Sequence, residues 1–453
     1  MRDPLACFKA YDVRGRVPDE LDAALARRIA QAFAAEVRGK RIAVGRDNRA
    51  TSAELAAAVI EGVRDAGAEA LDLGLCGTEL VYFAAFDGAL DGGAMVTASH
   101  NPSDHNGLKL VGAGAAPLGA RSGLDRIRAA VEAGPRPPAA ARGGARPLDV
   151  WERYSDRVLS FVAGEPLRPL RIVVDAGNGC AGLAVDRLAS RLPFTLIRER
   201  HEPDGRFPHG VPNPLLPERR ARTAAAVRTH RADLGVAWDG DFDRCFLFDE
   251  HGAFVEGYYV VGLIAAALLD RHPGATIVHD PRLTWNTREV VAAAGGVAVQ
   301  SVTGHGPMKA AMRASDALYG GEMSGHHYFR DFGHCDSGMV PWLLVAALVS
   351  RTGQPLSALV ERWRAAYPVS GEINRVVSDP PAALRAVAAR FRAGALTEDQ
   401  SDGLSLEHAR WRCNLRPSNT EALLRLNVET RGDGELLQRM TAELLAVIGG
   451  SAA

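Results

Sequence analysis

The strongest constraint on the fold of this chain is one order of secondary-structure signals that occurs three times. In the first stretch an apolar strand, a helical segment and two further strands follow one another, at residues 41–45, 52–66, 70–74 and 93–96. The strands recur at residues 171–175, 194–197 and 234–238, and again at residues 276–279, 297–300 and 317–319. Short apolar strands that alternate with helical segments predict βαβ crossovers and a mostly parallel sheet in each stretch.

The last part of the chain lacks this alternation. It combines predicted strands at residues 373–377, 411–415 and 423–428 with helices at 381–391 and 435–448, a pattern typical of a smaller α+β domain. A proline- and glycine-rich stretch at residues 133–147 indicates a linker. We therefore predict three similar α/β domains with mixed, mostly parallel sheets and a C-terminal α+β domain, with boundaries at residues 1–149, 150–249, 250–365 and 366–453.

Composition and charge exclude several classes of function. The formal net charge is −1, so no basic surplus points to nucleic acid or to an anionic membrane. No apolar run approaches the roughly 18 residues of a membrane span, and the first residues lack the apolar core of a signal peptide. The six cysteines form no C-x-x-C pair, which argues against a zinc site or a disulfide framework. We expect a cytoplasmic enzyme with buried, reduced thiols.

Each third strand runs into a polar loop that contains glycine: T-A-S-H-N-P at 97–102, D-G-D-F-D-R at 239–244 and G-E-M-S-G-H at 321–326. Ligands of open α/β sheets collect at the carboxyl ends of the strands. We therefore expect the three loops to converge on one site between domains, where small-molecule sites are common.

The loop D-G-D-F-D-R offers three carboxylates on alternate residues, Asp239, Asp241 and Asp243. In an extended loop this spacing can turn all three toward one hard cation, and ligands that are all oxygen favour Mg²⁺ over zinc or copper. Arg244 follows directly, and its planar guanidinium is suited to a phosphate group. A solvated acidic turn is the alternative interpretation.

The loop T-A-S-H-N-P places Ser99 among small residues, with His100 beside it and Lys109 a short distance along the chain. A serine on such a turn can act as a nucleophile or carry a phosphate. The compact ammonium of Lys109 is suited to a phosphoryl oxygen or to proton transfer. Taken alone, the pattern favours the alternative interpretations, a serine that only stabilises its turn and an ordinary surface lysine.

The loop G-E-M-S-G-H can bind sugar hydroxyls through Glu322 and Ser324, and His326 titrates near neutral pH, which suits it to proton transfer. His305 lies in T-G-H-G at 303–306 and is a second candidate for substrate binding, with a packing role as the alternative interpretation. In the last domain R-P-S-N-T-E offers many donors to a phosphate dianion, and Arg425 can add a second cation. The donors of that loop are Arg416, Ser418, Asn419 and Thr420.

Taken together, these four loops resemble, in this order, those of the α-D-phosphohexomutase family. The resemblance covers essentially the whole chain, and the segments 8–15, 175–179 and 201–208 agree with it. G-E-M-S-G-H and the opening segment resemble the bacterial bifunctional phosphomannomutase/phosphoglucomutase group. Residues 280–286 resemble the members that supply sugar nucleotides for polysaccharides, although Arg282 stands where relatives often have lysine.

The resemblance implies four domains around a central cleft and a phosphoserine at Ser99. It implies that Mg²⁺ is held by the phosphoserine and the three aspartates, and that Glu322 and Ser324 choose the hexose. The catalytic set it implies is Ser99, His100, Lys109, Arg244 and His326. The remaining substrate-binding residues it implies are Tyr11, Arg14, Arg282, His305, Arg416, Ser418, Asn419, Thr420 and Arg425.

The reaction implied is a reversible interconversion of hexose 1-phosphate and hexose 6-phosphate, of mannose or glucose, through glucose 1,6-bisphosphate or its mannose counterpart. Such an enzyme binds small sugar phosphates, and we expect a monomer. The general base stays open among Lys109, His326 and Arg14. Two other functions are considered: an aspartyl-phosphate hydrolase with Asp239 as nucleophile, and an inactive sugar-phosphate sensor.

Overall fold

A computed structural model of the protein describes residues 3–119, 123–417 and 423–452. Contacts within the chain divide it into two compact units. Unit 1 comprises Met1–Phe254 and Ser324–Pro355, and unit 2 comprises Val255–Met323 and Leu356–Ala453. Each unit is described by itself.

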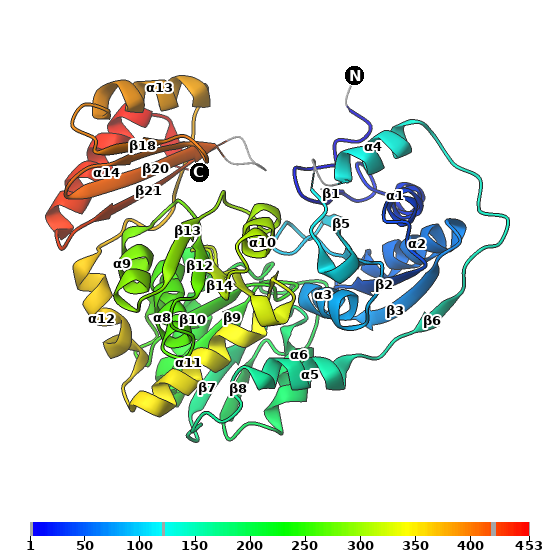
Figure 1. Ribbon diagram of the computed structural model, residues 1–453, viewed down its shortest axis with the longest axis horizontal. Coiled ribbons are helices and arrows are strands. Elements are labelled where there is room, and N and C mark those ends of the chain that lie inside the picture. Colours follow the sequence, from blue (N-terminus) through cyan, green and yellow to red (C-terminus); the bar gives the residue numbers. More distant parts are fainter. Residues whose placement is uncertain (1–2, 120–122, 418–422, 453) are drawn as a thin grey trace. The chain divides into compact units, whose positions relative to one another are not determined.

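The first sheet of unit 1 has six strands in the order β1-β5-β4-β2-β3-β6 (Figure 1). Its central strands β2 (Arg41–Arg46), β3 (Glu69–Leu75) and β4 (Gly92–Val96) are parallel, whereas β1 (Val13–Arg16) and β5 (His105–Gly112) run antiparallel to their neighbours. The accompanying helices are α1 (Ala23–Glu36), α2 (Ser52–Asp65), α3 (Thr78–Asp87) and α4 (Leu124–Glu132). The predicted linker differs in one respect, because its last residues form β6 (Ala145–Pro147), which pairs in parallel with β3.

The second sheet of unit 1 repeats this arrangement. Strands β7 (Arg171–Asp175), β8 (Thr195–Glu199) and β9 (Leu234–Trp238) are parallel, and β10 (Cys245–Phe248) lies antiparallel beside β9. The remaining elements of this unit are α5 (Trp151–Ser160), α6 (Ala181–Ala189), α7 (Ala221–His230), β15 (His327–Phe329), β16 (Cys335–Asp336) and α11 (Met339–Thr352). A short strand, β11 (Phe254–Val255), lies where the chain passes from unit 1 to unit 2.

Unit 2 contains the third copy of the repeat. Strand β12 (Thr276–His279) lies between β13 (Val297–Gln300) and β14 (Tyr319–Gly321), with both pairings parallel. Its helices are α8 (Gly257–Leu269), α9 (Trp285–Ala293), α10 (His305–Ala314) and α12 (Leu356–Ala366). The orders β3-β2-β4, β8-β7-β9 and β13-β12-β14 are equivalent, so the three-fold repeat predicted from the sequence is confirmed.

The rest of unit 2 is a six-stranded sheet in the order β18-β19-β20-β21-β17-β22. Its pairings of known register are all antiparallel, as expected of the α+β region. The strands are β17 (Ile373–Val376), β18 (Thr397–Asp399), β19 (Leu404–Glu407), β20 (Trp411–Pro417), β21 (Leu424–Thr430) and β22 (Ser451–Ala452). Helices α13 (Pro380–Phe391) and α14 (Gly434–Ile448) bury apolar side chains in a core with this sheet.

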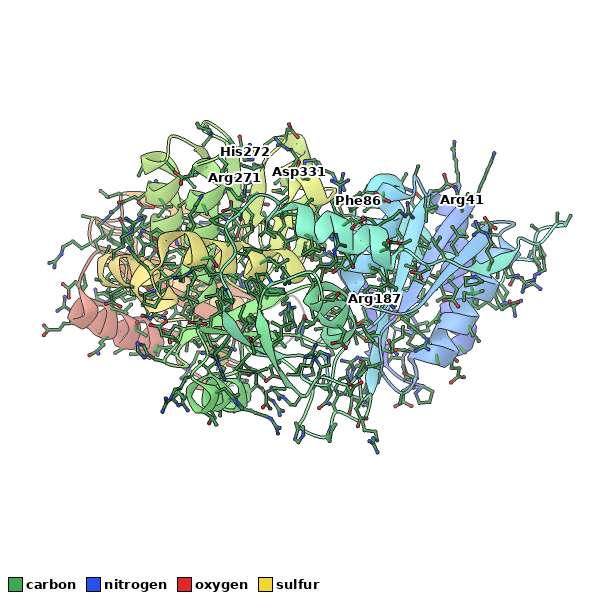
Figure 2. All side chains as sticks on the ribbon, turned by 90° about the horizontal axis from the view of Figure 1, so that it is seen from below. Arg41, Phe86, Arg187, Arg271, His272 and Asp331 are labelled. Atoms are coloured by element: carbon green, nitrogen blue, oxygen red, sulfur yellow. The ribbon has the colours of Figure 1, made fainter. Side chains whose placement is uncertain are left out.

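An aromatic cluster connects three elements of unit 1. Phe86 of α3 is labelled in Figure 2. It lies edge-on to Phe83 and to Phe332, with ring centroids 5.4 Å apart in both pairs. Tyr154 of α5 packs against Phe83 and Phe332 at 5.8 and 6.4 Å. Such edge-on pairs add stabilisation beyond the burial of apolar area. The cluster holds α3, the helix that follows β3, to α5 and to the turn that contains Phe332.

The six cysteines are free and buried, as the sequence indicates. Among the described residues no single helix is both long and apolar enough to cross a membrane. Helices α11 and α12 meet those two criteria only when they are counted together across the break between them.

Helices α1 and α2 pack closely enough to require a glycine. A Cβ atom at Gly62 of α2 would overlap the carbonyl oxygen of Arg27 and lie 2.8 Å from the Cβ of Ala30. We predict that Gly62→Ala lowers the free energy of unfolding by about 1–3 kcal/mol, the usual cost of overpacking. Urea denaturation measures this change. Gly144→Ala, at an exposed position with no atom near the added Cβ, is the control and should leave stability close to that of the wild type.

Candidate active site

Ser99 follows β4 in a buried loop with an unusual backbone conformation. Its φ of +52° lies in the left-handed region, which is unfavourable for a residue other than glycine. The backbone N–H of Ser99 donates to Oγ1 of Thr97 at 2.8 Å, which helps to hold this conformation. Its hydroxyl donates to Oδ2 of Asp239 at 2.7 Å and lies 3.0 Å from Nδ1 of His100. The structure thus brings three predicted site residues together.

Arg49 supports this loop, and our sequence analysis missed it. It is buried beside Asp47, whose carboxylate lies 3.4 Å from its Nε. Its guanidinium donates at 2.6–2.9 Å to the backbone carbonyls of Ser99, Asn101, Pro102 and His105. The sequence carries a signal for it, because D-N-R at residues 47–49 follows β2, and ligands of open α/β sheets collect at the carboxyl ends of the strands.

The three aspartates of D-G-D-F-D-R lie next to Ser99 and are buried. Each offers one carboxylate oxygen to a group in which all such atoms lie within 4.8 Å of one another. Gly240 is required here, because a Cβ atom at that position would lie 2.6 Å from the carbonyl oxygen of Ser99. The close approach of the two loops therefore depends on the residue between the first two aspartates.

Lys109 is the cation among these carboxylates. It projects from β5, is buried, and its ammonium pairs with Asp241 at 2.6 Å and also with Asp243. Burial opposes the charged form, but the two carboxylates outweigh it and raise the pKa of Lys109. Thr78, at the start of α3, donates its hydroxyl to the same oxygen of Asp241 and its backbone N–H to the carbonyl of Asp241. Lys109 is therefore held as a cation.

The aspartate group fits a hard metal ion. Burial, together with the charges of Asp243 and Asp241, raises the pKa of Asp239 to about 8, so a further cation beside it would favour its ionised form. Oδ1 of Asp239 and Oδ1 of Asp241 are buried and accept no hydrogen bond from the described residues. Buried carboxylate oxygens of this kind are the donors that hard divalent cations prefer.

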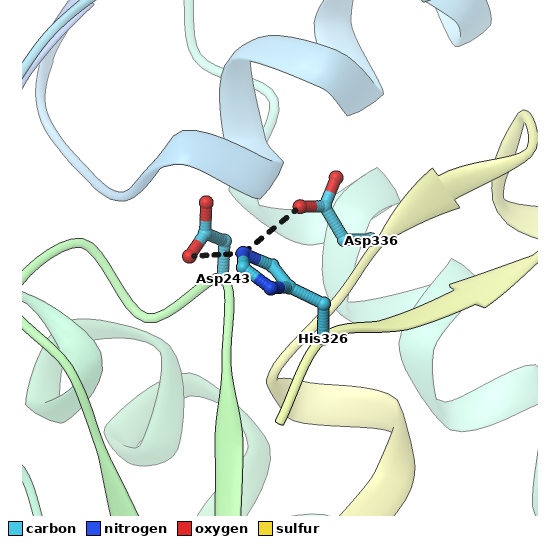
Figure 3. A group of neighbouring side chains, drawn as sticks. All are labelled: Asp243, His326 and Asp336. Carbon is cyan, nitrogen blue, oxygen red and sulfur yellow. Dashed lines mark ion pairs between the residues drawn. The ribbon is translucent and has the colours of Figure 1, made fainter. Parts of the chain in front are cut away.

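Arg244 and His326 stand on the other side of the aspartates. Nε of Arg244 lies 3.5 Å from Oδ2 of Asp239 and donates to Nε2 of His326 at 3.3 Å. The same Nε2 faces Asp243 at 3.6 Å and Asp336 at 3.8 Å (Figure 3). Asp336 is a buried residue of β16, and the sequence analysis did not predict it as a site residue.

His100 and Arg14 complete the group of predicted site residues in unit 1. Burial and then the nearby Arg244 lower the pKa of His100 well below its usual value, so its ring is neutral. Arg14 of β1 donates to Asp12 and to the side chain of Asn101, both at 2.7 Å. Tyr11 lies half-buried just before β1, and Ser324, predicted to bind the sugar, lies 3.3 Å from Nδ1 of His326.

Unit 2 holds the other predicted binding residues. Arg282, in the loop after β12, is buried and donates to Oδ2 of Asp280 at 2.7 Å. Glu322 follows β14, lies 3.5 Å from the same guanidinium and accepts the N–H of Gly304 at 2.9 Å. His305 is the first residue of α10 and is half-buried. The predicted strand at 317–319 in fact begins at Tyr319 and ends at Gly321, directly before Glu322.

Arg416 and Arg425 face each other on neighbouring strands, as their direct pairing in the β20–β21 register requires. Arg416 is buried, and this burial, with the charge of Arg282, lowers its pKa. Both arginines lie near Glu372, which the sequence analysis did not single out. Ser418, Asn419 and Thr420 lie outside the described residues.

Comparisons with known proteins test the resemblance and the fold class. Four family models match, described as phosphoglucomutase/phosphomannomutase alpha/beta/alpha domains I, II and III and C-terminal domain. They match residues 6–136, 152–252, 256–366 and 372–447. The resemblance drawn from the four loops and the predicted fold class are both confirmed.

Similar proteins span the same length. A phosphomannomutase of Salmonella montevideo is 52% identical over 98% of this chain and 99% of its own. A protein of Xanthomonas campestris pv. campestris called phosphohexose mutases is 52% identical over 98% of this chain and all of its own. The crystal structure of a phosphoglucomutase/phosphomannomutase family protein of Burkholderia thailandensis, 32% identical, matches with a TM-score of 0.88 over the full length of both chains.

The burial of His327, the residue after His326, is expected to make the stability of the protein depend on pH. Burial lowers the pKa of His327 to about 3, whereas an unfolded chain has a histidine pKa of about 6.5. Below pH 6.5 the unfolded state therefore binds a proton that the folded state does not, and stability falls as the pH falls. We predict a loss approaching about 1.4 kcal/mol per pH unit between pH 6 and 5 from this residue.

Urea denaturation at several pH values measures this loss. His327→Gln should be less dependent on pH by that amount, whereas the exposed His251→Gln should keep the wild-type dependence. An identical slope in wild type and His327→Gln would contradict the prediction.

Proposed function

The chain belongs to the phosphoglucomutase/phosphomannomutase family and is a phosphohexomutase, and we propose that its reaction runs through a phosphoserine at Ser99. The observation that carries this proposal is the 2.7 Å contact between the Ser99 hydroxyl and Asp239, within a group of three buried aspartates. A hydroxyl beside a cation site is where a phosphoryl group can be both carried and transferred.

In the proposed reaction the phosphoryl group leaves Oγ of Ser99 and bonds to the free hydroxyl oxygen of a mannose or glucose monophosphate. The product is a hexose 1,6-bisphosphate, and its other phosphate then returns to Oγ of Ser99. The net result interconverts hexose 1-phosphate and hexose 6-phosphate. Catalysis of this kind relies on positioning and on charge stabilisation.

Asp239, Asp241 and Asp243 would hold Mg²⁺ together with the phosphoserine, and the ion would stabilise charge on the transferring group. Lys109 and Arg244 supply the charge of the chain itself. Both point at these aspartates, so they can bind phosphoryl oxygens in the transition state.

His326 is the best of the three candidates for taking the proton of the attacking hydroxyl. Lys109 is held as a cation by two aspartates, and the guanidinium of Arg14 does not lose its proton in proteins. His326 is the remaining group, and its Nε2 accepts a hydrogen bond from Arg244. A histidine whose ring nitrogen acts as an acceptor is suited to general-base catalysis.

In unit 2 we assign Glu322 to the sugar hydroxyls and Arg416, Arg425 and Arg282 to the phosphate that is not reacting, with Ser324 of unit 1 as a second sugar contact. Ser418, Asn419 and Thr420 are proposed to contribute to the same phosphate, and Tyr11 and His305 to substrate binding. We further propose that the enzyme acts as a monomer in the cytoplasm. Its product would feed sugar-nucleotide synthesis for polysaccharides, in keeping with residues 280–286.

The proposed transfer of the phosphoryl group through Ser99, which we call the relay, makes a direct prediction. Purified protein should carry one added phosphoryl group at Ser99, and Ser99→Ala should lose this group together with at least about 1000-fold in turnover. Intact-mass analysis with peptide mapping and a coupled mutase assay measure both. The exposed Ser160→Ala is the control and should keep the phosphate and the activity. Phosphate on Asp239 instead would favour the aspartyl-phosphate mechanism, and full turnover by Ser99→Ala would exclude the relay.

A separate experiment tests whether Arg416 binds the phosphate that is not reacting. Arg416→Ala removes a buried guanidinium, and we predict that KM rises about 10–100-fold while kcat changes less, as expected for a lost charge-assisted hydrogen bond. Steady-state kinetics with mannose 1-phosphate measure the change. Arg439→Ala, on the exposed face of α14, should leave KM unaltered. A KM unchanged in Arg416→Ala would count against this role.

A further inference from the structure

Three arginines of unit 2 surround one carboxylate, that of Glu372. The register of the sheet explains part of this arrangement, since Arg425 lies directly opposite both Arg416 of β20 and Asn374 of β17. Residues directly opposite each other in an antiparallel sheet share a face, and side chains two positions apart on one strand do the same. Glu372, two residues before Asn374, therefore lies toward the face that carries both arginines.

The contacts of Glu372 are charged but long. Its Oε2 lies 3.3 Å from Arg282 and 3.6 Å from Arg416, and its Oε1 lies 3.5 Å from Arg425. Burial acts to raise the pKa of Glu372, but the charges of the three arginines outweigh it and lower the pKa. The group is therefore an anion at neutral pH that three cations share, with one hydrogen bond, from Arg282 at 3.3 Å.

Asp280 provides the comparison within the same cluster. It accepts two hydrogen bonds from Arg282, at 2.7 and 2.9 Å, and a third from the N–H of Met323 at 2.9 Å. Its side chain is 3% exposed, whereas that of Glu372 is 19% exposed. Asp280 is thus a fixed structural partner, whereas the carboxylate of Glu372 can exchange its contacts for water.

Among the described residues, carboxylates already offset the positive charge of the cluster without a ligand. Three guanidinium groups face the carboxylates of Asp280, Glu322 and Glu372, and the charge of Asp402 acts on Arg416 as well. A ligand with one negative charge that displaced Glu372 would restore the same balance with no electrostatic gain. A phosphate dianion brings two charges and three oxygens, so it gains contacts that one carboxylate does not make.

We propose that Glu372 is a specificity-determining residue, whose carboxylate acts as an internal competitor at the arginine cluster and admits a phosphate dianion in preference to a monoanion. The inference rests on the proposed function in one respect, that these arginines bind the phosphate of the substrate. It adds a residue that lowers the affinity for phosphate but increases the selectivity for a dianion over a monoanion. A pocket can discriminate in this way when each ligand must compete with a group of the protein itself, here the carboxylate of Glu372.

An opposite role for Glu372 would have the opposite consequence. If the carboxylate served to hold the arginines in position for the ligand, its removal would weaken phosphate binding. The direction of the change in affinity therefore separates a competitor from a positioning group.

The experiment is isothermal titration calorimetry of the full-length chain with mannose 6-phosphate, in wild type and in Glu372→Gln. We expect binding to become roughly fivefold tighter in Glu372→Gln, which corresponds to the loss of a partly exposed ion pair. We also expect formate, added at constant ionic strength, to compete with mannose 6-phosphate in the variant and not in the wild type. Glu372→Ala should change affinity in the same direction, and the exposed Glu435→Gln should match the wild type.

A second comparison locates the effect at the arginines. In an Arg416→Ala background the gain from Glu372→Gln should shrink, because one of the cations for which Glu372 competes is gone. Unchanged or weaker binding in Glu372→Gln would overturn the proposal, as would an equal gain in both backgrounds. The measurement needs no turnover, so its failure is distinct from failure of the proposed mutase reaction, which a mutase assay of the wild type tests separately.

Discussion

Three carboxylates buried within a few ångströms of one another, those of Asp239, Asp241 and Asp243, govern the structure around the site in unit 1. Such a group repels itself strongly in a medium of low dielectric constant, and the chain responds with cations from two other elements. Lys109 reaches Asp241 and Asp243 from β5, and Arg244 lies beside Asp239. Burial, with the charges of Asp243 and Asp241, still raises the pKa of Asp239, so a further cation at this position would favour its ionised form.

The loop that contains Ser99 is held in its conformation by contacts from Arg49 and Asp239. Ser99 adopts a left-handed backbone, and the cost of that conformation is offset by the four carbonyl contacts of Arg49 and by the hydrogen bond from Ser99 to Asp239. The close packing against Gly240 leaves the loop no room to relax. A hydroxyl held in this way is positioned before any substrate arrives, which is what a transfer reaction requires.

The carboxylates of unit 2 differ from the aspartate group of unit 1 in how they are held. Its carboxylates are either fixed by several hydrogen bonds, as Asp280 is, or loosely held and partly exposed, as Glu372 is. The chemistry is accordingly divided, with the groups suited to phosphoryl transfer in unit 1 and most of the groups suited to binding the sugar and its phosphate in unit 2. The proposed function accounts for this division, because one phosphate of the sugar would be transferred while the other would be held.

The sequence by itself determined the repeated strand order, the three parallel strands that open each repeat, three strands of the last domain and the loops that carry the chemistry, but it did not predict several antiparallel strands, among them β1, β5, β10 and β19. The predicted features are local: strand and helix periodicities span a few residues, and a motif such as D-G-D-F-D-R carries its own charges. Even so, β6 was read as part of a linker, because three exposed residues leave no periodic pattern. Only the tertiary structure decided which side chains meet. The contacts from Lys109 to Asp241, from Arg49 to the Ser99 loop and from Glu372 to three arginines join distant segments, and they follow from strand order and register, which no local pattern encodes.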